Sequence, residues 1–271
     1  MGRISKAGSG TRIGAPISRA LLLRGWSMVQ DLFMPPICQH CRAKRWGQAP
    51  LCLACLKRLA PLRPPLCEGC GLPDCNLDHP QEEFPFNSVR FLFRMTPELS
   101  TLVHGFKYRH FRRQIPFLCL YLRYRPDLIE YLRTFDGLVP VPIHPIRRRE
   151  RGYNQAEIIA KELSRISGVP ILPQALRRKR YTESQTKLAR RARGGNLASA
   201  FACSNPEVLM GKRLLIIDDV FTTGATAVQC ANLLLGAGGQ SVGVFALARV
   251  ETKDEQDDFG QEMEAASGYV A

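Results

Sequence analysis

The segment from Leu214 to Thr226 constrains the fold of this chain more than any other. Its first four residues, Leu214 to Ile217, are wholly apolar, as in strands buried on both faces of a parallel sheet. Two carboxylates, Asp218 and Asp219, end this strand, and a loop of small and hydroxyl residues leads into a helix expected from Ala225 to Leu235. Ligands of open α/β sheets bind beyond the carboxyl ends of the strands. The segment therefore predicts a parallel α/β sheet with an anion-binding loop at that edge.

The residues of this loop suit a phosphate and a sugar. Thr222, Thr223 and Thr226 offer hydroxyl donors, and Gly224 lets the backbone approach a phosphate closely. The two carboxylates before the loop can accept hydrogen bonds from the vicinal hydroxyls of a sugar. The alternative is that the acids only cap the following helix, although capping needs one acid rather than two beside three threonines and a glycine.

A second segment repeats the pattern of strand, loop and helix. Leu138 to Ile143 is a strand candidate in which Pro140 and Pro142 favour a sheet edge. The expected loop holds Arg147, Arg148, Arg149, Arg151 and Gly152. Guanidinium groups bind phosphate oxygens in bidentate fashion, so this loop is the candidate pyrophosphate site, and Asn154 can cap the next helix. A solvated basic turn is the alternative interpretation.

A third segment, from Arg177 to Phe201, is long, polar and basic. Gly194 and Gly195 are candidate hinges within it. Such loops often close over a reaction and exclude water. A nucleic-acid-binding arm or a disordered run are the other interpretations of this composition.

The order of the elements predicts an α/β fold with a doubly wound parallel sheet over residues 90–250. A strand and helices are expected from Phe91 to Arg133, with Pro97 opening the first helix. Apolar residues recur at helical spacing from Ala156 to Ile166, and Gly168 follows as a stop. Strands that alternate with helices are typical of βαβ units.

The rest of the chain predicts three further parts. Residues 1–34 read as an unstructured leader with a short helix, residues 35–80 as a cysteine module, and residues 251–271 as an acidic, disordered tail. That tail carries a charge of −6, so the remaining residues carry +20 of a total charge of +14. A body this basic favours anionic partners, either a phosphorylated small molecule or nucleic acid. The only apolar run near the start is too short for a membrane span, so a cytoplasmic protein is expected.

The cysteine module predicts structural zinc. Cys38, Cys41, Cys52 and Cys55 form two CxxC knuckles, and two knuckles together offer four thiolates at tetrahedral spacing. A redox pair or an iron–sulfur cluster would use similar residues. His40 lies between two ligands and is interpreted as an exposed knuckle residue rather than a ligand.

A second zinc site is a further candidate in this module. It would use Cys67, Cys70, Cys75 and His79, which depart from a simple pair of CxxC knuckles. The isolated Cys119, Cys203 and Cys230 are expected to be packing residues.

The run LLIIDDVFTTGATA, which ends at Ala227, resembles the phosphoribosyl pyrophosphate loop of type I phosphoribosyltransferases. Together with RRRERGYNQAE, RYTESQTKLARRARGGNLASAF and the cysteine module, it identifies the chain over about residues 28–249 as similar to the ComF/GntX family. That resemblance implies a phosphoribosyltransferase-like fold behind a zinc-binding module. It also implies a role in DNA uptake during natural transformation, and no particular substrate.

The resemblance also implies roles for single residues. It implies that Asp218 and Asp219 bind the ribose 2′ and 3′ hydroxyls and take part in catalysis. It also implies that the loop binds the 5′-phosphate of phosphoribosyl pyrophosphate. The residues of this loop are Phe221, Thr222, Thr223, Gly224, Ala225 and Thr226. Mg²⁺ would bridge the pyrophosphate oxygens and the ribose hydroxyls. Lys107, in a family-like HGFKY run, and His144, at a strand end, are further candidates for substrate contact and proton transfer.

Two functions remain open on this sequence. One is a phosphoribosyltransferase with an unidentified acceptor, in which carboxylates, an anion loop and arginines stabilise a cationic sugar and its leaving group. The other is a non-catalytic adaptor or sensor that binds zinc and single-stranded DNA and contacts DNA-uptake proteins. A homodimer is compatible with either function, and no segment of the sequence indicates a nucleobase hood.

Overall fold

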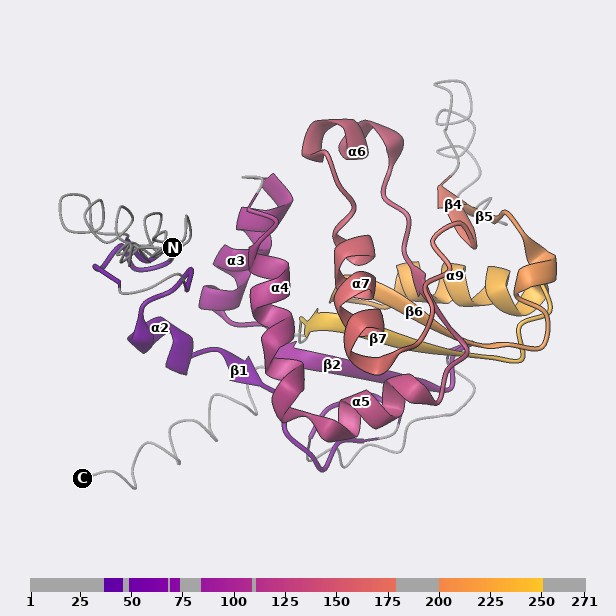
Figure 1. Ribbon diagram of the computed structural model, residues 1–271, viewed down its shortest axis with the longest axis horizontal. Coiled ribbons are helices and arrows are strands. Elements are labelled where there is room, and N and C mark those ends of the chain that lie inside the picture. Colours follow the sequence, from indigo (N-terminus) through magenta and orange to yellow (C-terminus); the bar gives the residue numbers. More distant parts are fainter. Residues whose placement is uncertain are drawn as a thin grey trace, which may run out of the picture.

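The computed structural model describes residues 37–45, 49–67, 69–73, 84–108, 111–178 and 200–250 (Figure 1). Several predictions lie outside the described residues: the leader, the acidic tail, Cys75, His79 and most of the basic segment that begins at Arg177. Among the described residues, no helix is both long and apolar enough to pass through a membrane.

A five-stranded sheet forms the centre of the domain. Its strands lie in the order β1 (Ala60–Pro61), β2 (Ser88–Arg94), β7 (Ser241–Arg249), β6 (Arg213–Phe221) and β3 (Gly137–Pro140). The four strands from β2 to β3 are parallel, and the short β1 runs antiparallel to β2. This arrangement confirms the predicted fold class. It brings the carboxyl ends of the neighbouring strands β6 and β3 to the same edge of the sheet.

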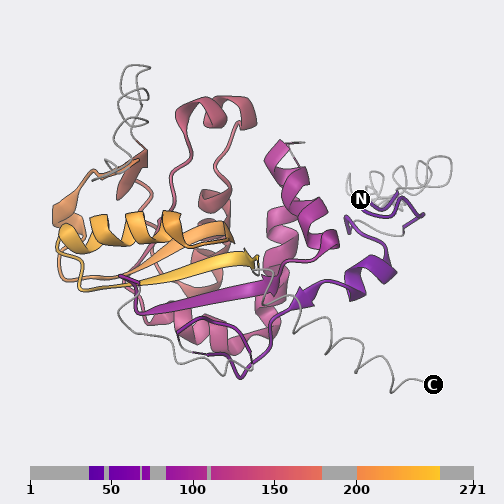
Figure 2. The same cartoon turned by 180° about the vertical axis from the view of Figure 1, so that it is seen from behind.

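Helices cover both faces of this sheet, as Figures 1 and 2 show from opposite sides. The helices are α2 (Leu53–Lys57), α3 (Pro97–Tyr108), α4 (Gln114–Cys119), α5 (Pro126–Arg133), α6 (Pro145–Arg151), α7 (Gln155–Ser167) and α9 (Ala225–Gly236), with 3-10 turns η1 (Leu120–Tyr124) and η2 (Pro206–Val208). Helix α9 lies on one face, and α3, α4, α5 and α7 pack on the other. A separate hairpin of β4 (Leu176–Arg178) and β5 (Phe201–Cys203) frames the basic segment.

The apolar run of β6 explains why both faces are covered. Leu215 and Ile217 belong to the core beneath α7, whereas Leu214 and Ile216 belong to the core beneath α9. Because successive side chains of a strand point to opposite faces, a strand buried on both sides must be apolar throughout.

Local signals place the ends of several elements. Asn154 caps α7 by accepting a hydrogen bond from the backbone N–H of Ala156, as predicted, and Gly168 ends that helix in a left-handed conformation. Strand β3 lies at the sheet edge, as its two prolines predict, but it ends at Pro140 rather than Ile143. A proline has no backbone N–H, so Pro140 and Pro142 cannot donate to the ladder and the strand is short.

The first half of the cysteine module packs directly on the sheet domain. Cys38, Leu51, Cys55 and Leu59 are buried in the same core as α3 and α4. Strand β1, which follows α2, adds to the edge of the central sheet beside β2. The module and the sheet domain therefore share one apolar core.

Candidate functional site

Two adjacent carboxylates end the buried part of β6. The backbone N–H of Asp219 donates to Oδ1 of Asp218 at 2.8 Å. Burial, and next the negative charge of Asp219, raise the pKa of Asp218 to about 7, far above that of an ordinary aspartate. The site thus holds a carboxyl group that is harder to ionise than an ordinary aspartate.

Asp219 makes an ion pair that the sequence pattern did not predict. Its Oδ2 lies 3.0 Å from Nζ of Lys107, and both side chains are largely buried. Lys107 belongs to the last turn of α3, far from β6 in sequence. The structure thus brings the HGFKY lysine to an acid of the predicted site, and its contact with a substrate stays a prediction.

The predicted phosphate loop lies between β6 and α9. Gly224 adopts a left-handed conformation with φ of 75°, and a Cβ at this position would lie 2.8 Å from the ring of Phe221. The Phe221 ring is buried against Phe91, with ring centroids 5.2 Å apart. Phe221, a predicted ligand contact, thus lies under the loop with its side chain packed in the core. Glycine is required above it both for the conformation and for the close approach.

The upper surface of the loop is open. Thr222, Thr223 and Thr226 are exposed, as is Ala225. Within the described part of the chain, the backbone N–H groups from Thr222 to Ala227 make no hydrogen bond. Helix α9 has no side-chain cap, so neither carboxylate serves as its cap. N–H groups without a backbone partner at the start of a twelve-residue helix, together with three hydroxyls, fit the predicted anion-binding site.

The predicted pyrophosphate loop is helical rather than irregular. Residues Pro145–Arg151 form α6, which has no buried residue and stands clear of the sheet in Figure 1. Signals for this helix were present in the sequence. His144 accepts a hydrogen bond from the backbone N–H of Ile146, Pro145 occupies the first turn, and Gly152 ends the helix with φ of 75°.

The arginines of α6 are divided between two sides. Arg148 forms a bidentate ion pair with Glu157 of α7, at 2.7 and 3.2 Å. The guanidinium of Arg151 lies 5.1 Å from the ring centroid of Tyr108, at the end of α3. Arg147 and Arg149 are exposed. The structure thus places this group at the same sheet edge as the acids, with two of its guanidinium groups held by neighbours.

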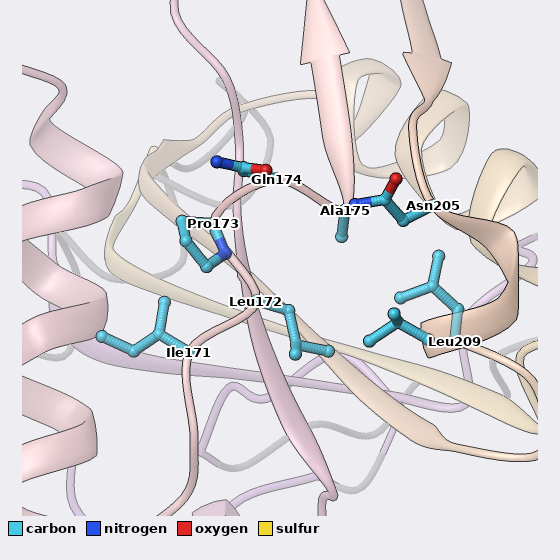
Figure 3. Close-up of a pocket in the computed structure, with 8 residues that line it drawn as sticks. Ile171, Leu172, Pro173, Gln174, Ala175, Asn205 and Leu209 are labelled. Carbon is cyan, nitrogen blue, oxygen red and sulfur yellow. The ribbon is translucent and has the colours of Figure 1, made fainter.

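Two hollows lie on the β3 side of this edge. The larger, of about 400 Å³, is lined by Arg148, Asn154 and Glu157, and by Arg177 and Arg178 at the base of the basic segment. The smaller, of about 180 Å³, lies beside β4, and its wall includes Ile171, Leu172 and Leu209 (Figure 3). No predicted site residue lines the smaller hollow, whereas the larger one is basic and continuous with α6.

The first four cysteines converge in the structure. The sulfur atoms of Cys38, Cys41, Cys52 and Cys55 all lie within 4.8 Å of one another, and those of Cys41 and Cys52 are 3.6 Å apart. A zinc–thiolate bond of about 2.3 Å gives sulfur separations of this size in a tetrahedron. Burial raises the pKa of the Cys38 thiol, but hydrogen bonds from several backbone N–H groups, including those of Cys52 and Cys41, together lower it to about 6. The lowered pKa favours the thiolate that zinc needs. These residues fit structural zinc.

Cys67 and Cys70 form a second knuckle with the same backbone geometry. In the first knuckle, the N–H of Arg42 donates to the carbonyl of Cys38 at 3.1 Å, and in the second, the N–H of Gly71 donates to the carbonyl of Cys67 at 3.0 Å. Each leading cysteine also donates its own N–H to the carbonyl five residues later, at 2.8 Å. Arg42 and Gly71 both have positive φ. The chain therefore builds two equivalent knuckles, although the remaining candidates, Cys75 and His79, lie outside the described residues.

His40 is not the exposed knuckle residue that the sequence suggested. Its Nδ1 is 2.9 Å from Oγ1 of Thr101, and its Nε2 is 3.7 Å from the buried carboxylate of Glu98. Arg58 approaches the same carboxylate at 3.5 Å. Thr101 and Glu98 belong to α3, so the first zinc knuckle is attached to the helix whose last turn holds Lys107.

The isolated cysteines behave as predicted for packing residues. Cys119 and Cys230 are buried in the two cores, and burial raises the pKa of both thiols, to about 12 for Cys230. The negative charge of Asp218 adds to the effect at Cys230, which belongs to α9.

Comparison with known proteins agrees with both parts of the structure. Residues 29–85 match the double zinc ribbon domain family, and residues 149–264 match the phosphoribosyl transferase domain family. The chain is 32% identical over 231 residues to the DNA utilization protein YhgH of Salmonella typhimurium, covering 80% of this chain and 99% of that protein. It is 30% identical to competence protein F of Haemophilus influenzae, covering 78% and 96%. It is 26% identical to competence protein ComFC of Bacillus subtilis, covering 73% and 84%.

Among solved structures, a purine phosphoribosyltransferase from Pyrococcus horikoshii is 20% identical, with a TM-score of 0.30, and the match covers 46% of this chain and 79% of that chain. A phosphoribosylpyrophosphate synthetase from Mycobacterium smegmatis is 16% identical, with a TM-score of 0.31, over 51% and 36% of the two chains.

The four-cysteine cluster predicts that purified protein carries zinc. Cys55→Ser should lower the zinc content and the free energy of unfolding, because metal binding supplies folding energy to such modules. Cys203→Ser, which changes an isolated thiol, is the control. Metal analysis and urea unfolding of the two variants measure the effect. Protein prepared without chelator that contains no zinc would contradict the prediction.

The buried carboxyl of Asp218 predicts an unusual pH dependence. Its folded pKa of about 7 lies above the unfolded value of about 3.9, so the folded state holds an extra proton between these values and loses stability as pH rises through 7. Asp218→Asn removes that loss and keeps the acceptor for the N–H of Asp219. We expect the variant to be more stable at pH 8 by about 1–3 kcal/mol and equal to the parent near pH 4. Equal unfolding curves at pH 8 would show that Asp218 has an ordinary pKa.

Proposed function

Since this chain belongs to the family of competence protein F and DNA utilization protein YhgH, we propose that the site at the end of β6 binds phosphoribosyl pyrophosphate. The observation that carries this proposal is the pairing of two carboxylates with an unoccupied set of backbone N–H groups. Asp218 and Asp219 end β6, and the N–H groups from Thr222 onward follow at once. A sugar phosphate needs acceptors for vicinal hydroxyls and donors for a phosphate, a few ångströms apart.

Each part of this ligand has a counterpart in the chain. The 5′-phosphate binds to the loop from Thr222 to Thr226 and to the start of α9. The ribose 2′ and 3′ hydroxyls donate to Asp218 and Asp219, and ionised carboxylates are the stronger acceptors. The pyrophosphate lies toward α6, where Arg147, Arg148, Arg151 and Gly152 are the predicted contacts. Arg148 must leave Glu157 if it binds the ligand, since one guanidinium fork cannot hold both partners.

Magnesium fits the same site by the chemistry of its donors. Mg²⁺ prefers hard oxygen ligands and keeps several waters, and the carboxylates and phosphate oxygens of this complex supply them. When bound, the ion would neutralise charge on the pyrophosphate. The protein's own residues orient the sugar and hold its 5′-phosphate in place.

The same geometry supports transfer of the phosphoribosyl group to an acceptor. Loss of pyrophosphate leaves positive charge on the sugar, and the two carboxylates at the end of β6 lie where they would stabilise it. The hairpin of β4 and β5 places Arg177 and Arg178 beside the larger hollow. The acceptor is to be sought with a pyrophosphate-release assay that offers nucleobases and single-stranded DNA in turn.

The charge distribution favours a second candidate function, as an adaptor that binds single-stranded DNA during DNA uptake in the cytoplasm. Exposed Arg147 and Arg149 of α6 and the basic base of the β4–β5 hairpin form one positive edge. Proteins that take DNA into the cell must handle a long polyanion, and such binding is dominated by phosphate contacts. DNA-uptake proteins and a second copy of this chain are the protein partners that this role would involve.

The role of the acids is tested by the double variant Asp218→Asn, Asp219→Asn. Each change removes a charged acceptor for a ribose hydroxyl, worth about 1.5–3 kcal/mol. Calorimetry with phosphoribosyl pyrophosphate in the presence of Mg²⁺ should therefore show that the double variant binds this ligand at least about tenfold more weakly than the parent. Asp136→Asn is the matched control, since Asp136 pairs with Arg213 at the opposite end of β6. Thermal unfolding verifies that each variant folds. Unchanged affinity in the double variant would make the acids structural.

Binding to single-stranded DNA is tested by a salt titration. The interaction should be mainly electrostatic, with log affinity falling by about 0.7 per neutralised phosphate for each tenfold rise in salt. Arg147→Ala with Arg149→Ala should reduce that slope, whereas Arg133→Ala on α5 should not. Phosphoribosyl pyrophosphate should compete in part, because α6 would serve both anions. Salt-insensitive binding, or none at low salt, would leave the basic edge to the small ligand alone.

A further inference from the structure

Three consecutive residues at the end of α3 contact the two segments that surround the site, β6 and the segment of α6 with the turn that follows it. The backbone carbonyl of Phe106 accepts a hydrogen bond from the hydroxyl of Tyr153, which follows α6. Nζ of Lys107 pairs with Asp219 at 3.0 Å, and the ring of Tyr108 lies under Arg151. Helix α3 stands beyond the arrowheads of β2 and β7 in both views (Figures 1 and 2). The last turn of α3 is therefore a third wall of the site, beside the β6 loop and α6.

The two acids face different layers of the fold. Asp218 lies close enough to Cys230 of α9 for its charge to act on that thiol, whereas Asp219 pairs with Lys107 of α3. The anion-binding N–H groups belong to the start of α9. A ligand whose 5′-phosphate lies at α9 and whose ribose lies over the acids must therefore direct its other end away from α9. Lys107, at the end of α3, and Arg151, at the end of α6, lie on that side.

We propose that Lys107 binds the pyrophosphate group of the ligand, and that it changes its partner from Asp219 to a phosphate oxygen when phosphoribosyl pyrophosphate binds. This inference rests on the proposed sugar-phosphate site. In the free protein, Lys107 neutralises an acid that would otherwise stand beside a second buried carboxyl. In the complex, the ribose hydroxyls replace Lys107 at Asp219, and the ammonium group moves to the pyrophosphate.

The chemistry of lysine suits this exchange. Its ammonium is a point charge with three donors on a flexible four-carbon stem, so it can reach a new acceptor without movement of the backbone. A pyrophosphate placed beside two carboxylates is repelled by them, and a cation between the groups removes that repulsion. Lysine near the C-terminus of α3 is also favoured by the helix dipole, which holds the charge at this wall in both states. Lys107 thus contacts an acid of the site directly.

Lys107→Met tests the proposal, with Lys107→Arg as the charge-conserving variant and Lys161→Met, an exposed lysine of α7, as the control. Calorimetry is run with two ligands that share the sugar and the 5′-phosphate, namely phosphoribosyl pyrophosphate and ribose 5-phosphate. We expect Lys107→Met to weaken binding of phosphoribosyl pyrophosphate at least about tenfold and that of ribose 5-phosphate by less than about threefold. Lys107→Arg should recover part of the loss, and inorganic pyrophosphate should compete less well with Lys107→Met than with the parent.

Each other outcome overturns the assignment. Tighter binding of both ligands by Lys107→Met would show that Lys107 only blocks the site in the free protein. An equal loss of affinity for both ligands would show that Lys107 only positions Asp219. If Lys107→Met does not fold, Lys107→Gln replaces it with the same two ligands. Failure of the proposed function gives a different result, because the parent protein would then bind neither ligand. Normal binding by Lys107→Met, with loss in the double aspartate variant, would reject the inference and keep the sugar site.

Discussion

The arrangement of the surrounding elements depends on two adjacent carboxylates, Asp218 and Asp219, at the end of a buried strand. Burial, and next the neighbouring carboxylate, raise the pKa of Asp218, and Asp219 forms an ion pair with Lys107. Such an arrangement costs folding free energy, so it persists only where the surrounding elements hold it in place. The buried core of β6, the glycine of the loop and the last turn of α3 are those elements. The cost is consistent with a site that is completed by a ligand with hydroxyl donors.

Helix α3 connects the cysteine module to this site. Its first half carries Glu98 and Thr101, which contact His40 of the first knuckle, and its last turn carries Lys107. Cys38 and Cys55 are buried in the core that α3 and α4 share. The zinc module therefore supports one wall of the proposed sugar site and is not a structurally separate unit.

The sequence predicted the elements whose signals are local. The apolar run of β6, the capping of α7 by Asn154 and the edge position of β3 were confirmed, because each depends on a few neighbouring residues. The sequence pattern predicts a loop where α6 forms, although Pro145 and Gly152 mark the two ends of this helix. The pairing of Lys107 with Asp219 and the docking of His40 on α3 join residues distant in sequence. No periodicity or motif encodes such contacts, since they depend on how α3 packs across the sheet.

The division of the arginines follows from the same packing. Two guanidinium groups of α6 are held in opposite directions, Arg148 by a carboxylate of α7 and Arg151 by the ring of Tyr108. A cation–π contact at a partly exposed ring is worth about 0.5–1 kcal/mol, and an exposed ion pair is worth no more. Either contact is weak compared with a bidentate bond to a phosphate. Helix α6 can thus exchange both internal partners for an anion at small cost, whereas Asp218 and Asp219 are fixed by the core. In the proposed complex, the acids define where the sugar lies, and the charged side chains of α3 and α6 adjust to the anion that the sugar carries.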